Sequence, residues 1–123
     1  MKFFRHDDIS IAYLDIPPTG EDREEPILLI HGFASTHAVN WLNTLWVKTL
    51  THAGRRVILL DNRGHGESGK LYAPSDYATE KMAGDAAALL DHLDIKRADV
   101  MGYSMGARIS AFLTLGRPDP RTP

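Results

Sequence analysis

Two short, uninterrupted apolar runs, 27–30 and 57–60, most constrain what this chain can fold into. Neither run alternates with polar residues, which indicates strands buried on both faces, as in a parallel sheet. The residues between them, 39–53, carry apolar side chains at spacings of three and four and predict one amphipathic helix that ends at Gly54. A strand, a helix and a second strand in this order predict a right-handed parallel crossover.

The same alternation continues as far as residue 115. The apolar side chains of 81–93 predict a second helix, whose inner face comprises Met82, Ala86, Leu89, Leu90 and Leu93. Residues 98–103 predict a third buried strand, and residues 105–115 predict a third helix. We therefore expect an α/β fold in which three parallel strands are joined by crossover helices.

The two ends of the chain differ in kind. Residues 2–6 and 9–15 predict an antiparallel hairpin that precedes the parallel strands. Three prolines in the last six residues exclude a regular helix or a central strand there. We expect one domain over residues 1–115 and an irregular proline-rich tail over 116–123.

Composition excludes several classes of protein. The 123 residues suffice for one domain, and the net charge of −2 gives no reason to expect a nucleic-acid partner. The chain has no cysteine, which excludes disulfides and thiolate catalysis. Its apolar runs are far too short to span a membrane, so we expect a cytoplasmic protein without a membrane partner.

Ser104 lies in a G-x-S-x-G pattern formed by Gly102 and Gly106, where the third predicted strand meets the third predicted helix. In that context the serine occupies a tight turn that exposes its hydroxyl to a substrate. The two glycines let the strand and the helix approach closely. The backbone N–H of Met105, in the first helical turn, is suited to stabilise a developing oxyanion.

A second glycine-rich segment, 64–69, matches the G-x-G-x-x-G pattern of dinucleotide sites, and Lys70 extends it toward a phosphate-binding loop. Leu71 stands where such a loop needs Ser or Thr, and no helix is predicted to follow at once. Glu67 would also repel a phosphate. We expect no nucleotide here and, since no metal-ligand spacing occurs, no cofactor or metal at all.

Three segments together resemble the α/β-hydrolase family in order and spacing: HGF at 31–33, DNRGHGES at 61–68 and GYSMGA at 102–107. The resemblance covers about residues 2–115. It implies that strand 26–31 lies between strands 56–61 and 98–103. It also implies at least three further strands, which carry the catalytic acid and histidine after the serine. We therefore expect a partial α/β-hydrolase fold that lacks the later strands.

The resemblance also implies roles for particular residues. Ser104 is the expected nucleophile, and the expected oxyanion donors are the backbone N–H groups of Met105 and, by resemblance, Phe33. The residues expected to shape the site are His31, Gly32, Gly102 and Gly106. A serine at this turn argues against the epoxide-hydrolase and haloalkane-dehalogenase branches, which use an aspartate there.

The sequence shows no base for this serine, because none of the nineteen residues after Ser104 is a histidine. Six histidines precede it, and we expect structural, turn or helix-end roles, or no assignable role, for His6, His31, His37, His52, His65 and His92. Other charged residues that we interpret as structural are Asp61 and Arg63, in an ion pair or turn, and Asp85 and Asp91, facing solvent or packing a helix. We expect Trp41, Trp46, Tyr72 and Tyr77 to pack the core or surface rather than line a pocket.

Three functional hypotheses follow. The first is a serine hydrolase of esters, thioesters or lactones that works through an acyl-serine, is truncated before its acid and histidine, and is therefore weak or inactive. The second is a non-catalytic binding module on a partial hydrolase scaffold. The third is a hydrolase completed by another chain. In the chain alone, the edge of strand 98–103 is expected to be exposed and available for association.

Overall fold

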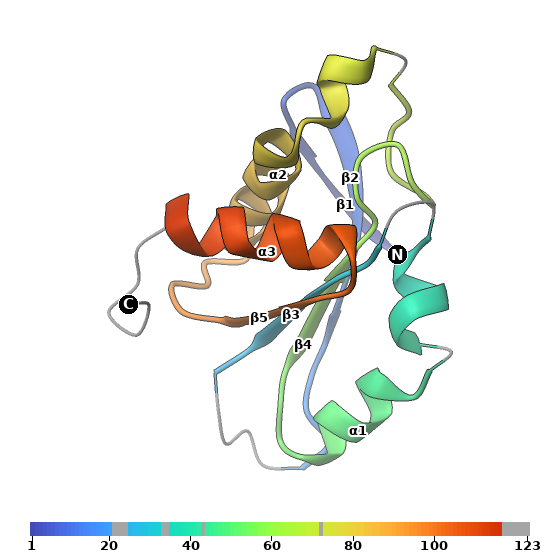
Figure 1. Cartoon of the computed structure of the whole chain (residues 1–123). Coiled ribbons are helices and arrows are strands. Elements are labelled where there is room, and N and C mark those ends of the chain that lie inside the picture. Colours follow the sequence, from blue (N-terminus) through green and yellow to red (C-terminus); the bar gives the residue numbers. More distant parts are fainter. Residues whose placement is uncertain (21–24, 33–34, 43, 72, 117–123) are drawn as a thin grey trace.

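The computed structural model describes residues 1–20, 25–32, 35–42, 44–71 and 73–116. Five strands form one sheet in the order β1-β2-β4-β3-β5 (Figure 1). The strands are β1 (Lys2–His6), β2 (Ile9–Ile16), β3 (Ile27–Ile30), β4 (Val57–Leu60) and β5 (Asp99–Gly102). The helices are α1 (Trp46–His52), α2 (Thr79–His92) and α3 (Met105–Gly116), with a π-helical turn at Ala38–Leu42 and a 3₁₀ turn at Pro74–Tyr77.

The sheet is antiparallel on one side and parallel on the other. β1 and β2 form the predicted hairpin, and β2 then pairs antiparallel with β4. β3 runs parallel to both of its neighbours, with Leu28 opposite Ile58 of β4 and Val100 of β5. The predicted position of β3 between β4 and β5 is thus confirmed, and so is the α/β class with three parallel strands.

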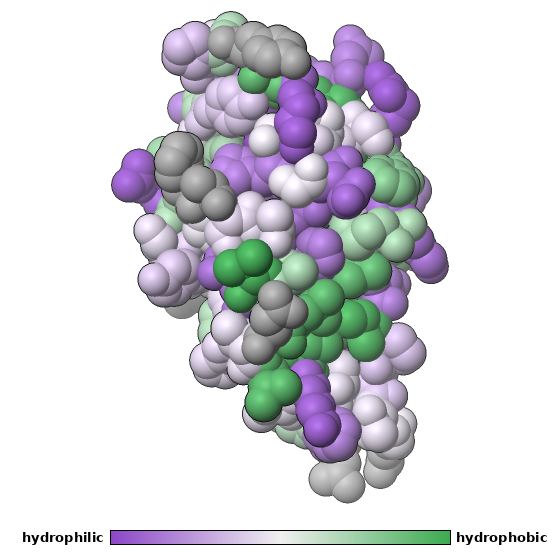
Figure 2. Space-filling view, turned by 90° about the vertical axis from the view of Figure 1, so that its right-hand side faces the viewer, coloured by the Kyte–Doolittle hydropathy of each residue, from purple (hydrophilic) through white to green (hydrophobic). Residues whose placement is uncertain are grey.

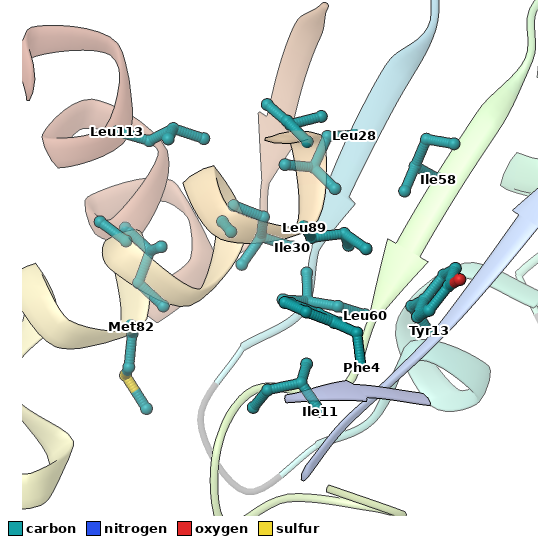
Figure 3. Close-up of a cluster of buried hydrophobic side chains, with 14 of the residues drawn as sticks. Phe4, Ile11, Tyr13, Leu28, Ile30, Ile58, Leu60, Met82, Leu89 and Leu113 are labelled. Carbon is teal, nitrogen blue, oxygen red and sulfur yellow. The ribbon is translucent and has the colours of Figure 1, made fainter. Parts of the chain in front are cut away.

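Helices cover both faces of the sheet, which explains why β3 and β4 are apolar throughout. Figure 1 shows α2 and α3 on one face and α1 on the other. Alternate side chains of β3 and β4 face the α2–α3 side, where Figure 3 shows Leu28, Ile30, Ile58 and Leu60 among the buried core residues. The intervening side chains, Ile27, Leu29, Val57 and Leu59, pack with Trp41 and Val47 on the α1 side.

The second predicted helix is confirmed with small changes at its ends. α2 spans Thr79–His92, and its buried side chains include Met82, Ala86, Leu89 and Leu90. Leu93, also predicted on the inner face, is partly buried just beyond the last helical residue. The third helix contributes Ile109 and Leu113 to the same core.

The single helix predicted over 39–53 is wrong. The chain forms the π-helical turn Ala38–Leu42 and then α1, and between them Leu45 adopts a left-handed φ of 68°. The Thr44 hydroxyl donates to the carbonyl of Asn40 at 2.5 Å, which competes with the regular helical pattern. Gly54, at φ 87°, follows the end of α1, where a left-handed glycine favours helix termination.

This break changes which apolar side chains are buried. Trp41 is 4% exposed in the core, whereas Leu45 is 62% and Trp46 is 45% exposed. Figure 2, which views the molecule from the side where α1 lies in Figure 1, shows hydrophobic side chains gathered on that face. Within the described residues, no helix has the length and apolar character needed to cross a membrane. The predicted tail lies outside the described residues beyond Gly116, so the proposed domain division stays a prediction.

Candidate active site

The carboxyl ends of the three parallel strands lie at one edge of the sheet, because parallel strands share a direction. The loop that begins with His31 and Gly32 follows β3, and the loop that begins with Asp61 follows β4. Ser104 comes two residues after β5 ends. In open α/β sheets this edge is where ligands bind. The topology therefore brings all three sequence motifs to one end of the molecule.

The turn at Ser104 is sharp and its side chain is exposed. Ser104 has a left-handed φ of 56°, which an L-residue seldom adopts outside functional or strained positions. α3 begins at the next residue, Met105. A Cβ atom on Gly106 would collide with the carbonyl of Ile30, and one on Gly102 would collide with the carbonyl of Gly106. The two glycines therefore allow α3 to start directly against β3 and β5.

The Met105 amide is favourably placed for binding an anion. The first N–H groups of a helix have no acceptor within the helix, and the helix dipole makes that end positive. The carbonyl of Ser104 already accepts hydrogen bonds from the amides of Ala107, at 3.0 Å, and Arg108, at 3.3 Å. These bonds fix the turn, so the neighbouring Met105 amide is held rigidly beside the serine.

His31 is fully buried and neutral. Its Nδ1–H donates to the carbonyl of Gly32 at 2.7 Å, and its Nε2 accepts the amide N–H of Asn62 at 2.9 Å. Burial lowers the pKa of His31 to about 4, so the ring carries no charge near pH 7. Because both ring nitrogens are engaged, His31 anchors the loop after β3 and has no free lone pair with which to act as a base.

Gly32 lies directly against the serine turn. A Cβ atom at Gly32 would lie 3.1 Å from Tyr103 Cδ2 and 3.5 Å from the Cβ of Ser104. The Gly32 amide donates to Oδ1 of Asn40 at 2.7 Å. Phe33, the predicted second oxyanion donor, lies outside the described residues. The loop after β3 and the turn at Ser104 are therefore in contact, as an oxyanion hole shared between them requires.

Asp61 organises the loop after β4. Its Oδ1 accepts both the amide N–H of His37, at 2.9 Å, and the Nδ1–H of the same ring, at 2.8 Å, while Oδ2 accepts the Glu67 amide at 3.0 Å. Burial raises the pKa of Asp61, but the hydrogen bonds from His37 and Glu67 outweigh that effect and leave the pKa below its usual value. The carboxylate is thus a structural centre, and it gives His37 a partner that sequence reasoning did not find.

Arg63 has a structural role, as predicted, but its ion-pair partner is Asp85 on α2 and not Asp61. Its Nε and Nη2 bind the two oxygens of Asp85 at 2.7 and 2.8 Å, and both side chains are 1% exposed. The hydrogen bond that Arg63 donates to Asp85 is the main reason why the pKa of Arg63 is raised above its usual value. The same guanidinium reaches the carboxylate of Asp7 at 3.2 Å, and His6 Nδ1 lies 2.8 Å from Asp85.

Of the two interpretations of Asp85, solvent-facing and helix-packing, the structure therefore supports the second. Asp85 lies three residues after Met82 and four before Leu89, so helical spacing already placed it on the buried face of α2. A carboxylate on a buried apolar face needs a cationic partner. In the structure this partner is Arg63. Asp91, by contrast, is exposed.

The remaining predicted residues take structural positions or lie outside the described part. His65 donates through Nδ1 to the carbonyl of Arg63 at 2.9 Å within its turn, and His92 stacks on Phe4 with ring centroids 5.2 Å apart. The hydroxyl of Tyr77 donates to the carbonyl of Leu71 at 2.6 Å, whereas Tyr72 is not described. Among the described residues, no histidine is hydrogen-bonded to Ser104, and no cluster of three metal-ligating side chains occurs.

Two curated proteins are similar to this chain over most of its length. Rhodomycin D methylesterase DnrP from Streptomyces peucetius is 35% identical over 101 residues, which are 81% of this chain and 33% of that protein. Epoxide hydrolase B from Mycobacterium tuberculosis is 31% identical over 109 residues, which are 88% of this chain and 29% of that protein. The chain thus spans about a third of the length of these relatives.

Solved structures are similar as well. The structure of Est816, described as an N-acyl homoserine lactone degrading enzyme, superimposes with a TM-score of 0.78 and 28% identity. The match covers 96% of this chain and 41% of that one. The family model for the alpha/beta hydrolase fold matches residues 25–120, which include all three motifs. This chain belongs to the α/β-hydrolase family.

Proposed function

We propose that the chain carries the nucleophile and the oxyanion-binding residues of a serine hydrolase that acts on esters, thioesters or lactones. The observation that carries this proposal is the conformation of Ser104, which is exposed at a left-handed φ of 56° directly before α3 and next to Gly32. A strained residue at the carboxyl end of a strand is typical of a catalytic nucleophile.

In the proposed reaction, Ser104 Oγ attacks the carbonyl carbon while a base removes its proton. The negative oxygen that forms is stabilised by the Met105 N–H and, we propose, by the Phe33 N–H. The tetrahedral intermediate then expels the alcohol or thiol, which takes up the proton, and leaves an acyl-serine. Water attacks this acyl group in a second step, which releases the acid and restores Ser104.

The other proposed site residues shape this centre rather than react. Gly102 and Gly106 permit the sharp turn, and Gly32 lets the loop after β3 touch it. His31 holds that loop through the Gly32 carbonyl. The required base and its acid are proposed to come from the part of the fold that the longer relatives have and this chain does not span.

The relatives support hydrolysis of a carbonyl compound but do not identify the substrate. A methylesterase and a lactone-degrading enzyme act on esters by their descriptions, whereas an epoxide hydrolase does not. Ser104 favours the first kind, because opening an epoxide in this family is associated with an aspartate at this position. By itself the chain is expected to be a very weak esterase, since serine without a base is a poor nucleophile.

Association through the open edge of β5 is a further part of the proposal. In the described residues β5 pairs within the sheet with β3 alone, so β5 is the edge strand on this side of the sheet. Tyr103, 61% exposed, and Phe112, 46% exposed, come from the turn after β5 and from α3. Exposed strand edges of this kind promote pairing with another chain.

A chimera tests the hydrolase proposal. The C-terminal part of a serine-dependent relative, with its acid and histidine, is joined after about Leu115, and turnover is measured on p-nitrophenyl acetate, a thioester, a lactone and an epoxide. We expect turnover of a carbonyl substrate to rise at least about 10³-fold over the unextended chain. The matched control, the same chimera with Ser104→Ala, should lose this gain.

Two results would overturn the proposal. A folded, monomeric chimera that turns over none of the carbonyl substrates would mean that Ser104 is not a hydrolytic nucleophile and would favour the non-catalytic module. Turnover of the epoxide alone would place the chain with the epoxide-opening relatives. Circular dichroism and size-exclusion chromatography establish that the chimera is folded and monomeric before either conclusion is drawn.

A further inference from the structure

We propose that the outer surface around α1 docks the protein on an anionic lipid bilayer as a peripheral contact. We call this surface the α1 face and define it by four exposed side chains, Val39, Leu45, Trp46 and Lys48. This docking does not depend on the reaction proposed above. The sequence led us to expect no membrane partner because its apolar runs are too short to span a bilayer, but a peripheral contact needs no spanning segment.

The α1 face exposes large apolar side chains that lie close together in the chain. Val39 is 56% exposed, and Leu45 and Trp46 are exposed to a similar extent. Beside them, the partly buried Leu42 and Leu50 pack against the buried cluster beneath α1. Figure 2 shows hydrophobic side chains gathered on this side of the molecule. A gathered apolar surface on a folded chain marks an interaction site.

The apolar surface continues onto the sheet next to α1. Leu14 and Ile16 of β2 pack against the same buried cluster. Ala12 lies on their side of the strand, because side chains alternate between the two faces of a sheet. Phe3 of β1 is directly opposite Ala12 and is 52% exposed. Phe3 therefore faces the same side of the sheet as α1 and enlarges the apolar surface.

Leu45 is held outward in a conformation that is unfavourable for the fold. Its φ of 68° lies in the left-handed region, which glycine adopts freely and a leucine seldom adopts. The exposed side chain of Leu45 adds little to the core in return. Glycine would be the better residue here for the stability of the chain alone. A strained and exposed leucine at the start of a helix therefore points to a contact outside the molecule.

The charge of this region favours an anionic lipid surface. Residues 26–60 contain no Asp or Glu, although the whole chain has 16 of them. The two arginines of this segment are paired with carboxylates of other segments. Lys48 is exposed on α1, three residues after Leu45, and thus lies on the same side of the helix. An apolar surface that carries positive charge and no carboxylate complements anionic headgroups above an apolar bilayer interior.

The same observations disfavour a second copy of the chain as the occupant. In a dimer with two-fold symmetry the patch meets itself, so Lys48 would face positive charge. Residues 26–60 offer no carboxylate to pair with it. A bilayer instead suits both polar side chains of the α1 face. The Trp46 ring fits the boundary between headgroups and acyl chains, and the Lys48 ammonium can reach the headgroups while its alkyl stem stays on the apolar surface.

The α1 face lies away from the sheet edge at which the longer relatives can continue the fold. α1 contacts β4, and the cluster beneath it includes side chains of β2, so α1 lies toward the N-terminal hairpin. The strand order β1-β2-β4-β3-β5 puts β5 at the opposite edge of the sheet. Strands added beside β5 would extend the sheet away from the α1 face. We therefore expect this face to stay open in a longer protein.

Vesicle co-sedimentation tests the proposal on the chain itself. The probes are unilamellar vesicles of phosphatidylcholine mixed with an equal amount of phosphatidylglycerol, and vesicles of phosphatidylcholine alone. We expect binding to the anionic vesicles to be at least about fivefold tighter than to the neutral ones. Added salt should weaken it, because ions screen the attraction of Lys48. A blue shift of the fluorescence should accompany binding and report on Trp46, since Trp41 is already buried.

Two variants and a matched control assign the contact to the α1 face. Lys48→Gln removes one positive charge and should weaken binding to the anionic vesicles about fivefold. Leu45→Gly removes an apolar side chain and relieves the strained φ, so it should stay folded and weaken binding at least about fivefold. Phe112→Ala removes a side chain of similar exposure from α3 and should leave binding within about twofold of the parent. Circular dichroism establishes that each variant is folded.

Several results would overturn the proposal. Equal binding to both kinds of vesicle, binding to neither, or an equal loss in Phe112→Ala would mean that the α1 face does not dock on anionic lipid. A dimer in sedimentation velocity that Leu45→Gly dissociates would assign the face to a second copy. The folded chimera described under Proposed function should bind the anionic vesicles as the chain does, and a loss there would show that the rest of the fold covers the face. A chimera that binds vesicles but hydrolyses nothing would refute the proposed function alone.

Discussion

The loop after β4 and the turn after β5 stand at the same end of the sheet, yet they are built in opposite ways. In the β4 loop Asp61, Arg63 and Ser68 are almost fully buried, and every one of these side chains has protein partners. In the turn after β5, Ser104 is exposed, and no described side chain is hydrogen-bonded to it. The motif with the most charged and polar residues is therefore structural, whereas the proposed nucleophile, Ser104, lies on a turn without side-chain hydrogen bonds from the described residues.

The largest test of this contrast removes the buried cation. Arg63→Ala leaves Asp85 buried without its main partner and should lower the free energy of unfolding by about 3–5 kcal/mol. Urea denaturation measures the change. In the matched control, Lys81→Ala, an ion pair is removed whose side chains are 43% and 33% exposed, and the loss should stay below about 1 kcal/mol.

A double variant sharpens the same test. Arg63→Ala combined with Asp85→Ala removes both buried charges and should recover part of the loss seen with Arg63→Ala alone. Equal losses for Arg63→Ala and Lys81→Ala would contradict the view that the β4 loop is a structural centre.

The next largest effect is a pH dependence that originates at His31. Its pKa is about 4 in the folded protein against an ordinary value of 6.5, because burial disfavours the charged ring. Between these values the unfolded chain binds a proton that the folded chain does not, so stability rises with pH in this window. Acidification from pH 6.5 to 4 should therefore remove about 3 kcal/mol of the free energy of unfolding.

The control separates His31 from Asp61. The pKa of Asp61 is depressed below 3.8, so its contribution is present above that value and is lost only at lower pH. Urea midpoints measured from pH 4 to 7 should show a steep slope for the parent chain and a shallower one for His31→Asn. An unchanged slope in His31→Asn would show that the acid sensitivity arises elsewhere.

The smallest effect concerns the serine turn itself. Ser104→Gly relieves the left-handed φ and should stabilise the fold by about 1 kcal/mol, as glycine adopts this conformation without steric cost. Ser110→Gly, within α3, should instead destabilise by about 0.5–1 kcal/mol. Thermal unfolding measures both changes. A higher stability of Ser104→Gly together with a lower stability of Ser110→Gly would show that the turn is strained. A lower stability of Ser104→Gly would mean that no strain is stored there.

The elements that could be predicted from the sequence are those determined by residues close together in the chain. β3 and β4 were predicted because burial on both faces leaves an unbroken apolar run, and the turn at Ser104 because two glycines are needed where strand and helix meet. The helix over 39–53 could not be predicted correctly. Apolar spacing does not reveal that Leu45 turns left-handed or that Thr44 bonds to the Asn40 carbonyl.

The polar partners were harder to predict because they lie far apart in the chain. Arg63 meets Asp85 from another element, and His37 meets Asp61 across the crossover between β3 and β4. No local pattern links such residues, since only the topology brings them together. Gly32 was expected from the family resemblance to shape the site, whereas its contact with the serine turn and its hydrogen bond to Asn40 were found only in the structure.

The order of strands has a consequence for how the chain reaches its fold. β2 is made second and pairs with β1 at once, but its other partner is β4, where Tyr13 pairs with Leu60. Contacts between residues so distant in sequence close large loops and slow folding. During synthesis, one edge of β2 therefore remains unpaired until β4 has been made. In this interval the nascent chain is most prone to incorrect strand pairing.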